Sequence, residues 1–257
     1  MKNLKGKIVF ITGASSGIGK AAAHKFAKAG ADIIISARRF ERIKHLAEDI
    51  KSKCGVNVYP FRLDVRNYKD VKKKINELPE KWKKIEILLN NAGLSRGLNK
   101  IQDGVLKDWE EMIDTNIKGL LYVTKEIIPL MLKNNSGHII NIGSIAGHDV
   151  YPGGNVYCAT KFAVDALTKS MRYDLNGTCI KVSTVDPGLL ESEFSIVRFH
   201  GDKQKAGKVY EGVVPLTPDD AADAVLYVAA RNDNVVIAEI ILMPKAQAGT
   251  MLLNRKT

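Results

Sequence analysis

The sequence has few cysteines and few histidines, and neither type is grouped. Its 257 residues include three cysteines, Cys54, Cys158 and Cys179, and five scattered histidines. No C-x-x-C or H-E-x-x-H spacing occurs among them. A sparse, odd set of cysteines does not build a disulfide framework, and scattered histidines do not predict a metal site. We therefore expect reduced thiols and no bound metal.

Long hydrophobic runs are also missing. No stretch of about 18 apolar residues occurs, so the sequence predicts no transmembrane helix. The first residues, MKNLKGKIVFITGASSG, reach glycine and serine too early for a secretory signal. We therefore expect a cytoplasmic protein without a membrane partner.

Positive charge is in excess, with a formal net charge of +11. The densest stretch, KDVKKKINELPEKWKK at 69–84, mixes acidic residues with the lysines at helical spacing, which is typical of a solvated helix face. No helix-turn-helix, zinc finger or RNA-binding signature accompanies it. Nucleic-acid binding is therefore not expected, although a positive field attracts anionic substrates.

What the sequence does contain is an alternation of two patterns. Nearly continuous apolar runs are typical of parallel strands covered on both faces, and they alternate here with amphipathic helical stretches. The expected strands are 7–12, 31–36, 56–61, 85–90, 138–143, 180–185 and 235–242, and the expected helices are 17–29, 40–53, 67–78, 108–133, 156–176 and 218–230. This order predicts an α/β fold, a Rossmann-type doubly wound parallel sheet of seven strands with helices on both faces. No linker or repeat interrupts it, so we expect one domain over 1–257.

The first expected strand leads into TGASSGIG at 12–19, with a helix beginning near residue 17. Glycines between a strand and a helix allow a tight turn and bring the backbone close to a pyrophosphate, which the helix N-terminus attracts. This turn predicts a dinucleotide site. Its residues are Gly13, Ser15, Ser16, Gly17, Ile18 and Gly19.

Two arginines follow the second expected strand. NAD-binding chains commonly place a carboxylate there for the ribose 2′-hydroxyl. This chain has Arg38 and Arg39 in SARRF, and guanidinium groups bind phosphate. The pair predicts NADP as the cofactor, the alternative being two solvated charges at a helix start.

Several motifs recur in a fixed order along the chain. They are TGASSGIG, LDV at 63–65, NNAG at 90–93, Asn116 in DTNIKG, GS at 143–144, YCATK at 157–161 and DPG at 186–188. With them the sequence resembles the classical short-chain dehydrogenases/reductases over nearly its whole length. The resemblance implies the catalytic set Asn116, Ser144, Tyr157 and Lys161. It also implies cofactor contacts from Asp64, Val65, Asn91, Ala92, Gly93, Tyr157, Lys161, Pro187, Gly188 and Leu189.

Tyr157 and Lys161 lie four residues apart, on one face of an expected helix. A tyrosine with its ordinary pKa near about 10 is a poor base at neutral pH, and a neighbouring ammonium favours the phenolate. We expect Lys161 to lower the pKa of Tyr157, which acts as general acid/base, and to hold the nicotinamide ribose. Ser144 would stabilise charge on the reacting oxygen, and Asn116 would anchor a water beside Lys161. Taken singly, each residue has a structural alternative, such as a turn serine or a surface lysine.

The segment after the sixth expected strand is long and polar, which suits a mobile substrate lid over 189–215. With EFSIVRF it resembles the NADP-dependent 3-hydroxy acid dehydrogenases, the group that includes serine 3-dehydrogenase. Serine, L-allo-threonine or 3-hydroxyisobutyrate are the expected substrates. Arg198 in the lid is the candidate for binding their carboxylate. The alternative is a lid salt bridge from Arg198 to Glu191, Glu193 or Asp202.

Other functions stay open at this point. A 3-oxoacyl carrier-protein reductase would use the same catalytic residues, and a non-catalytic NADP-binding module would use the same glycine turn. The family resemblance also implies a homotetramer. Its interfaces would be formed by the helices at 108–133 and 156–176 and by the last helix and strand.

Overall fold

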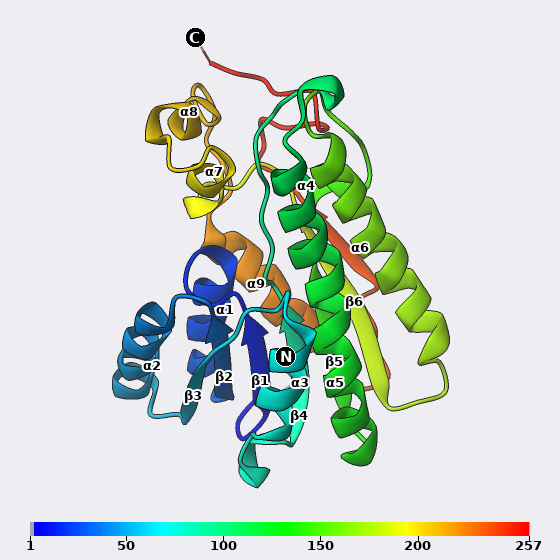
Figure 1. Cartoon of the computed structure of the whole chain (residues 1–257). Helices are drawn as coiled ribbons and strands as arrows, with labels where there is room; N and C mark the ends of the chain where they lie inside the picture. The colour runs from blue at the N-terminus through cyan, green and yellow to red at the C-terminus, as the bar shows by residue number, and fades with distance from the viewer. Residues whose placement is uncertain (1–2, 257) are drawn as a thin grey trace.

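A parallel sheet forms the centre of the molecule, as the computed structural model shows for residues 3–256. Its seven strands lie in the order β3-β2-β1-β4-β5-β6-β7 (Figure 1). The strands are β1 (Ile8–Thr12), β2 (Asp32–Ala37), β3 (Val58–Arg62), β4 (Ile85–Asn90), β5 (Gly137–Ile142), β6 (Ile180–Pro187) and β7 (Glu239–Leu242). The predicted doubly wound, seven-stranded parallel fold is confirmed.

Helices cover both faces of this sheet (Figure 1). They are α1 (Gly17–Lys28), α2 (Phe40–Cys54), α3 (Tyr68–Asn76), α4 (Leu106–Ile113), α5 (Leu120–Lys133), α6 (Asn155–Asp174), α7 (Glu193–Arg198), α8 (Lys203–Lys208) and α9 (Pro218–Ala229). Buried side chains of α1, α2 and α9 form one apolar core, and those of α3, α5 and α6 form the other. Within the described residues, none of these helices combines the length and the apolar character needed to cross a bilayer.

The central strand β1 shows why the strands read as continuous apolar runs. Val9 and Ile11 pack into the core under α1, whereas Ile8 and Phe10 pack into the core under α5. Phe10 and Ile11 are both 0% exposed. Burying each such side chain contributes about 1.5–3 kcal/mol, so both faces of the strand must be apolar.

One predicted helix, 108–133, is wrong as a single element. The structure has α4, then a π-helical turn η3 (Asp114–Gly119), then α5. At Gly119 an added Cβ would lie 2.6 Å from Val65 Cγ2, so this turn packs tightly against the side chain of Val65, in the loop after β3. The apolar period continues on both sides of the turn, which is why the sequence pattern did not reveal it. Such turns occur often at functional sites.

The C-terminal third differs from expectation in two further details. Strand β7 begins at Glu239 rather than at 235. The polar segment after β6 is not irregular throughout, because it contains α7 and α8. Ser192 caps α7 by accepting a hydrogen bond from Phe194 N, and Asp202 caps α8 by accepting one from Lys205 N.

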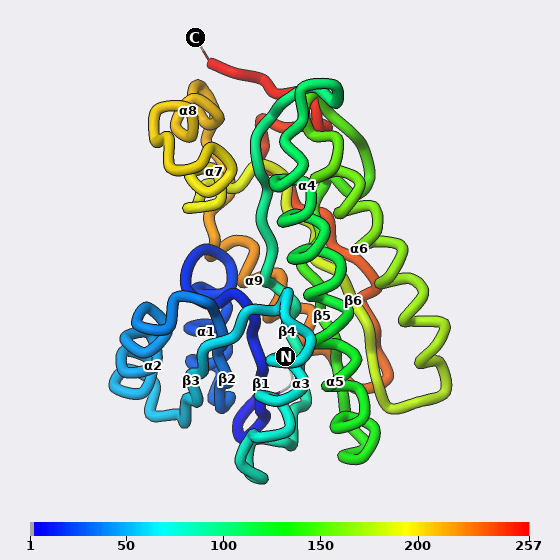
Figure 2. The backbone as a smooth tube through the Cα atoms, viewed as in Figure 1, coloured from blue at the N-terminus to red at the C-terminus, as the bar shows by residue number. Residues whose placement is uncertain are grey.

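The topology places several loops at one edge of the sheet. All seven strands are parallel, so their carboxyl ends share an edge, and the strand order reverses direction between β1 and β4. Ligands of such sheets bind at this switch point. Figure 2 shows α7, α8 and the C-terminal chain on that same side of the sheet.

Candidate active site

A cavity of about 810 Å³ opens at the carboxyl edge of the sheet. The glycine turn, the ends of the strands and the lid segment line it together. The predicted residues that line it are Gly13, Ser15, Ser16, Gly17, Ile18, Arg38, Arg39, Asp64, Val65, Asn91, Ala92, Gly93, Ser144, Tyr157, Lys161, Pro187, Gly188, Leu189 and Arg198. Gly19 and Asn116 do not line it and lie just behind its wall.

The glycine turn has the backbone that the sequence predicts for it. Gly13 and Gly17 have φ of +67° and +54°, which L side chains rarely adopt. A Cβ on Gly13 would lie 2.8 Å from Ala92 Cα, and one on Gly19 would lie 2.4 Å from Asn91 Nδ2. Gly19 therefore acts through close packing of α1 on the loop after β4, not as part of the cavity wall.

Arg39 lies beside the glycine turn. Its Nη2 donates hydrogen bonds to Ser15 Oγ and to Ser16 Oγ, both at 2.9 Å. Its Nη1 donates to Glu193 Oε2 at 2.8 Å. The two serine hydroxyls hold the guanidinium group where a phosphate on the adenosine ribose would be expected.

Arg42 joins Arg39 at this position and was missed by the sequence analysis. Its Nη1 donates to Glu193 Oε1 at 2.7 Å. In sequence it is one more charge in the first turn of a surface helix, and no motif marks it. Arg38 also lines the cavity, but its Nη1 lies 3.5 Å from Glu111 Oε1. The structure thus pairs Arg39 with Arg42 rather than with Arg38.

Helix α6 brings the predicted catalytic tyrosine and lysine onto one turn. Tyr157 is 8% exposed and Lys161 is 7% exposed. Lys161 Nζ lies 5.9 Å from the centroid of the tyrosine ring and donates a hydrogen bond to Ile142 O at 2.8 Å. Ser144 lies beside Tyr157, with which it makes a hydrogen bond. Its Oγ also accepts a hydrogen bond from Ala146 N at 3.1 Å and caps the short helix η4 (Ile145–Gly147).

Burial controls the proton affinity of both α6 residues. It raises the pKa of Tyr157, while the charge of Arg198 and a hydrogen bond with Ser144 act in the opposite direction. Burial lowers the pKa of Lys161 to about 8, and the carboxylate of Asp186 opposes this. We expected Lys161 to lower the pKa of Tyr157. In the structure burial raises that pKa, and the cation that opposes the rise is Arg198, while Lys161 directs its ammonium to Ile142 O.

Asn116 lies in the π-helical turn and is 2% exposed. Its Oδ1 accepts a hydrogen bond from Leu94 N at 2.9 Å. Its Nδ2 donates to Leu94 O at 2.8 Å and to Thr160 Oγ1 at 3.0 Å. The side chain therefore ties the loop after β4 to α6 one residue before Lys161.

Arg198 lies at the end of α7, near the ring of Tyr157. Its guanidinium carbon is 5.4 Å from the ring centroid of Tyr157, 5.2 Å from that of Phe194 and 6.0 Å from that of Tyr151. Nη2 donates to the Tyr151 hydroxyl at 3.1 Å, and the buried Nε has no hydrogen-bond partner.

The alternative role considered for Arg198 was a lid salt bridge. Among the described residues it does not form, because Glu193 pairs with Arg39 and Arg42, Asp202 caps α8 and Glu191 is exposed to solvent. A guanidinium group in an aromatic surround, with a free donor and no acidic partner among the described residues, can bind an incoming anion.

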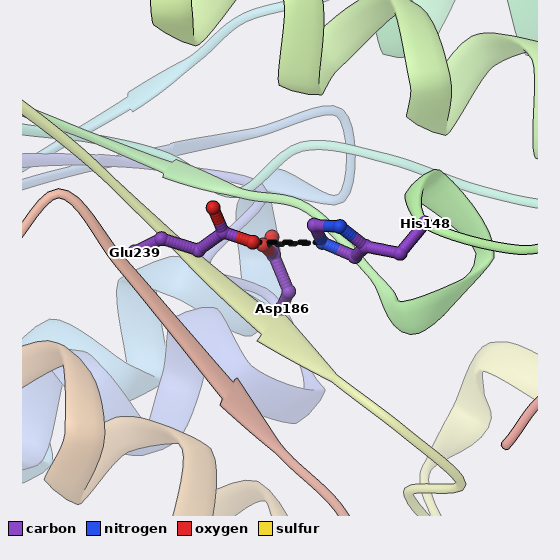
Figure 3. A group of neighbouring side chains, drawn as sticks. All are labelled: His148, Asp186 and Glu239. Carbon is purple, nitrogen blue, oxygen red and sulfur yellow. Dashed lines mark hydrogen bonds and ion pairs between the residues drawn. The ribbon is translucent and has the colours of Figure 1, made fainter.

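A group of three titratable side chains, His148, Asp186 and Glu239, was not predicted (Figure 3). His148 Nε2 is 2.9 Å from Asp186 Oδ2 and 3.2 Å from Glu239 Oε1, and Thr184 Oγ1 donates to Asp186 Oδ1 at 2.6 Å. The imidazole bridges the two carboxylates, so the three groups satisfy one another. They come from three distant segments, which is why no sequence spacing could reveal them.

Asp186 faces the strand end that holds Lys161. A Cβ on Gly143 would lie 1.8 Å from Asp186 Oδ1, so only glycine fits after Ile142. Because Ile142 O is the acceptor of Lys161 Nζ, the buried carboxylate lies close behind the catalytic lysine. It supplies the negative charge that helps Lys161 to stay protonated.

This geometry agrees with what known proteins show. Residues 7–202 match the short chain dehydrogenase family. The chain is 45% identical to an NADP-dependent 3-hydroxy acid dehydrogenase of Schizosaccharomyces pombe, over 100% of this chain and 99% of that protein. It is 43% identical to sulfoacetaldehyde reductase 2 of Chromohalobacter salexigens, over 94% and 95% of the two chains.

A solved structure gives the same result. The closed form of a serine dehydrogenase complexed with NADP⁺ superposes with a TM-score of 0.91 at 43% identity, over 97% of this chain and 100% of that one. The chain belongs to the short-chain dehydrogenase family and is an oxidoreductase of that family.

Proposed function

We propose that this protein is an NADP-dependent dehydrogenase of small 3-hydroxy acids such as serine, L-allo-threonine and 3-hydroxyisobutyrate. The observation that carries the proposal is the guanidinium group of Arg198, 5.4 Å from the Tyr157 ring centroid and free of any acidic partner among the described residues. It can bind a carboxylate whose carbon is two bonds away from the carbon that reacts at Tyr157. The similarity to a 3-hydroxy acid dehydrogenase and to a serine dehydrogenase supports the same substrate class.

Each polar residue of the cavity has a role in this reaction. The bound nicotinamide supplies hydride chemistry, and its adenosine and phosphates would lie along the glycine turn and the loop after β4. Tyr157 removes the hydroxyl proton during oxidation and returns it during reduction. Ser144 stabilises charge on the reacting oxygen. Lys161 would hold the ribose, the charge of Arg198 favours the phenolate of Tyr157, and Asn116 fixes the turn on which Tyr157 and Lys161 depend.

Two features support the choice of NADP as cofactor and the role of segment 189–215 as a lid. Arg39 and Arg42 form a guanidinium pair beside Ser15 and Ser16, which suits the 2′-phosphate of NADP rather than the free hydroxyl of NAD. The segment 189–215 carries Arg198 over the cavity, so its position controls access of water and substrate.

The test is the initial rate of NADPH formation from NADP with the three acids, with NAD run in parallel. We expect turnover with at least one acid, a clear preference for NADP, and a rise in KM of about 10- to 100-fold in Arg198→Ala, since loss of a charged hydrogen-bonding partner costs about 1.5–3 kcal/mol. The matched reaction is reduction of an uncharged diketone, for which Arg198→Ala should leave KM within about twofold of its wild-type value. Equal effects on the acid and the diketone would show that Arg198 does not bind the carboxylate.

A sulfonate substrate is the second candidate. Arg198 can bind a sulfonate as well as a carboxylate, and one relative at 43% identity is a sulfoacetaldehyde reductase. Turnover of sulfoacetaldehyde with no turnover of the three acids would select it. The carrier-protein reductase has weaker support, because an arginine directly over the catalytic tyrosine favours a small anion over an acyl chain.

We also propose that the protein forms a homotetramer. Large apolar side chains are exposed on the outer faces of α5 and α6, among them Leu121, Leu132, Phe162 and Tyr173, which are 38%, 44%, 41% and 84% exposed. A second copy of the same two helices would cover them and give the closed symmetry usual for oligomers.

A further inference from the structure

The first residue of the lid helix α7 binds the arginine pair beside the glycine turn. Glu193 accepts hydrogen bonds from Arg39 Nη1 at 2.8 Å and from Arg42 Nη1 at 2.7 and 2.9 Å. Arg39 is held at the same time by Ser15 and Ser16. The carboxylate thus occupies the position between the two guanidinium groups where an anionic group of a ligand would be bound.

We propose that Glu193 competes with the 2′-phosphate of NADP(H) for Arg39 and Arg42, and so determines cofactor specificity. This rests on the proposed NADP function. Carboxylates and phosphates bind guanidinium groups with the same two-pronged geometry, and the more highly charged phosphate is the stronger ligand. Glu193 is ionised at neutral pH, because the two arginines lower the pKa of its carboxyl group against the opposing effect of burial.

The same contact fixes the position of the lid. Helix α7 runs from Glu193 to Arg198, and six residues of helix rise only about 1.5 Å each. One end of this short helix therefore touches the cofactor arginines while the other lies over Tyr157. Displacement of Glu193 by a 2′-phosphate releases the first end, whereas NAD, which lacks the phosphate, leaves it in place. Binding of NADP(H), and not of NAD, would therefore free the Glu193 end of α7 from the arginine pair.

The experiment measures the Kd of NADPH, NADH, adenosine 2′,5′-bisphosphate and AMP for the wild-type protein, Glu193→Gln and Glu191→Gln. Glu191→Gln is the matched control, because Glu191 is an exposed lid glutamate two residues away that loses the same charge. In Glu193→Gln we expect NADPH and the bisphosphate to bind about three- to tenfold more tightly, the range expected for removal of competing surface ion pairs. NADH and AMP should bind as they do to the wild-type protein, and Glu191→Gln should change none of the four constants.

A double variant tests the route of the effect. If Glu193 acts through Arg42, then Glu193→Gln should tighten NADPH binding less when it is made in an Arg42→Gln background. Unchanged or weaker NADPH binding in Glu193→Gln would overturn the inference, and so would equal changes for NADPH and NADH.

The proposed function is tested separately. If the wild-type protein prefers NADPH but Glu193→Gln does not change NADPH binding, the proposed competition by Glu193 is wrong and the NADP assignment stands. If the wild-type protein binds NADH as tightly as NADPH, both the NADP assignment and this inference are wrong. Neither result depends on turnover of a hydroxy acid.

Discussion

At the scale of single residues, the site depends on a lysine that is costly to bury. Lys161 is 7% exposed, and burial lowers its pKa to about 8. A buried ammonium needs compensating negative charge or hydrogen bonds. The structure supplies Ile142 O as a direct acceptor and the carboxylate of Asp186 close behind it.

Asp186→Asn should make Lys161 easier to deprotonate. The titratable groups around the lysine are Asp186 on β6, His148 after η4 and Tyr157 on α6, and Asp186 is the one that raises the lysine pKa. Without this carboxylate the pKa of Lys161 falls below about 8, so its charge is lost at a lower pH. A tenfold loss of proton affinity would cut the charged fraction at pH 8 about fivefold.

The measurement is kcat/KM for carbonyl reduction as a function of pH. We expect the alkaline midpoint to move to lower pH in Asp186→Asn, with the rate nearly unchanged below the midpoint. Asp165→Asn is a control, since Asp165 pairs with Lys169 on the same helix but away from the cavity. A uniform loss of rate at every pH would mean that Asp186 only maintains the local fold.

At the scale of elements, the strands and the site motifs could be predicted from the sequence. The π-helical turn that interrupts the predicted helix 108–133 and the contacts between distant segments could not. The inner strands, such as β1, β2 and β4, are covered on both faces, so their apolar runs are unambiguous. The glycine turn has a strand before it and a helix after it. The π-helical turn at 114–119 escaped because the apolar period of α4 and α5 continues across it. Contacts such as Arg42 with Glu193, and His148 with Asp186 and Glu239, join residues that are distant in sequence and share no spacing.

Asn116→Ala should destabilise the junction that this turn makes. The asparagine satisfies the buried backbone N–H and C=O of Leu94 and binds Thr160 on α6. An unsatisfied buried polar group costs about 1–3 kcal/mol, so we expect the free energy of unfolding to fall by about 2–4 kcal/mol.

Urea unfolding followed by circular dichroism measures this loss. Asn134→Ala is a suitable control, because Asn134 makes one partly buried hydrogen bond, to Lys83 O, and should cost about 1 kcal/mol or less. Equal stabilities for the two variants would contradict the structural role of Asn116. If stability is lost but NADPH still binds normally once the protein is folded, the role of Asn116 is confined to the junction.

At the scale of the whole molecule, the turn of α6 that carries the proposed catalytic lysine lies directly beneath the proposed tetramer interface. Phe162 follows Lys161 in sequence and points outward, with 41% of its surface exposed. One side of this turn of α6 therefore holds the catalytic lysine in the cavity while the other presents a large apolar ring to a second copy. Assembly would fix α6 at the residues that carry the chemistry.

Phe162→Glu should weaken this assembly. It places a charge on the apolar face of α6, where a second copy would bury it without a partner, and burial of an unpaired charge is strongly unfavourable. We expect light scattering after size exclusion to show a tetramer for the wild-type protein and dimers or monomers for the variant at the same concentration. The same change at Val214, an 86% exposed residue outside α5 and α6, should leave the mass unchanged.

A monomeric wild-type protein would contradict the proposed tetramer, whereas an intact tetramer in Phe162→Glu would show that α6 is not its interface. If the variant dissociates and its kcat falls while NADPH binding persists, the interface supports catalysis by holding Tyr157 and Lys161 in position.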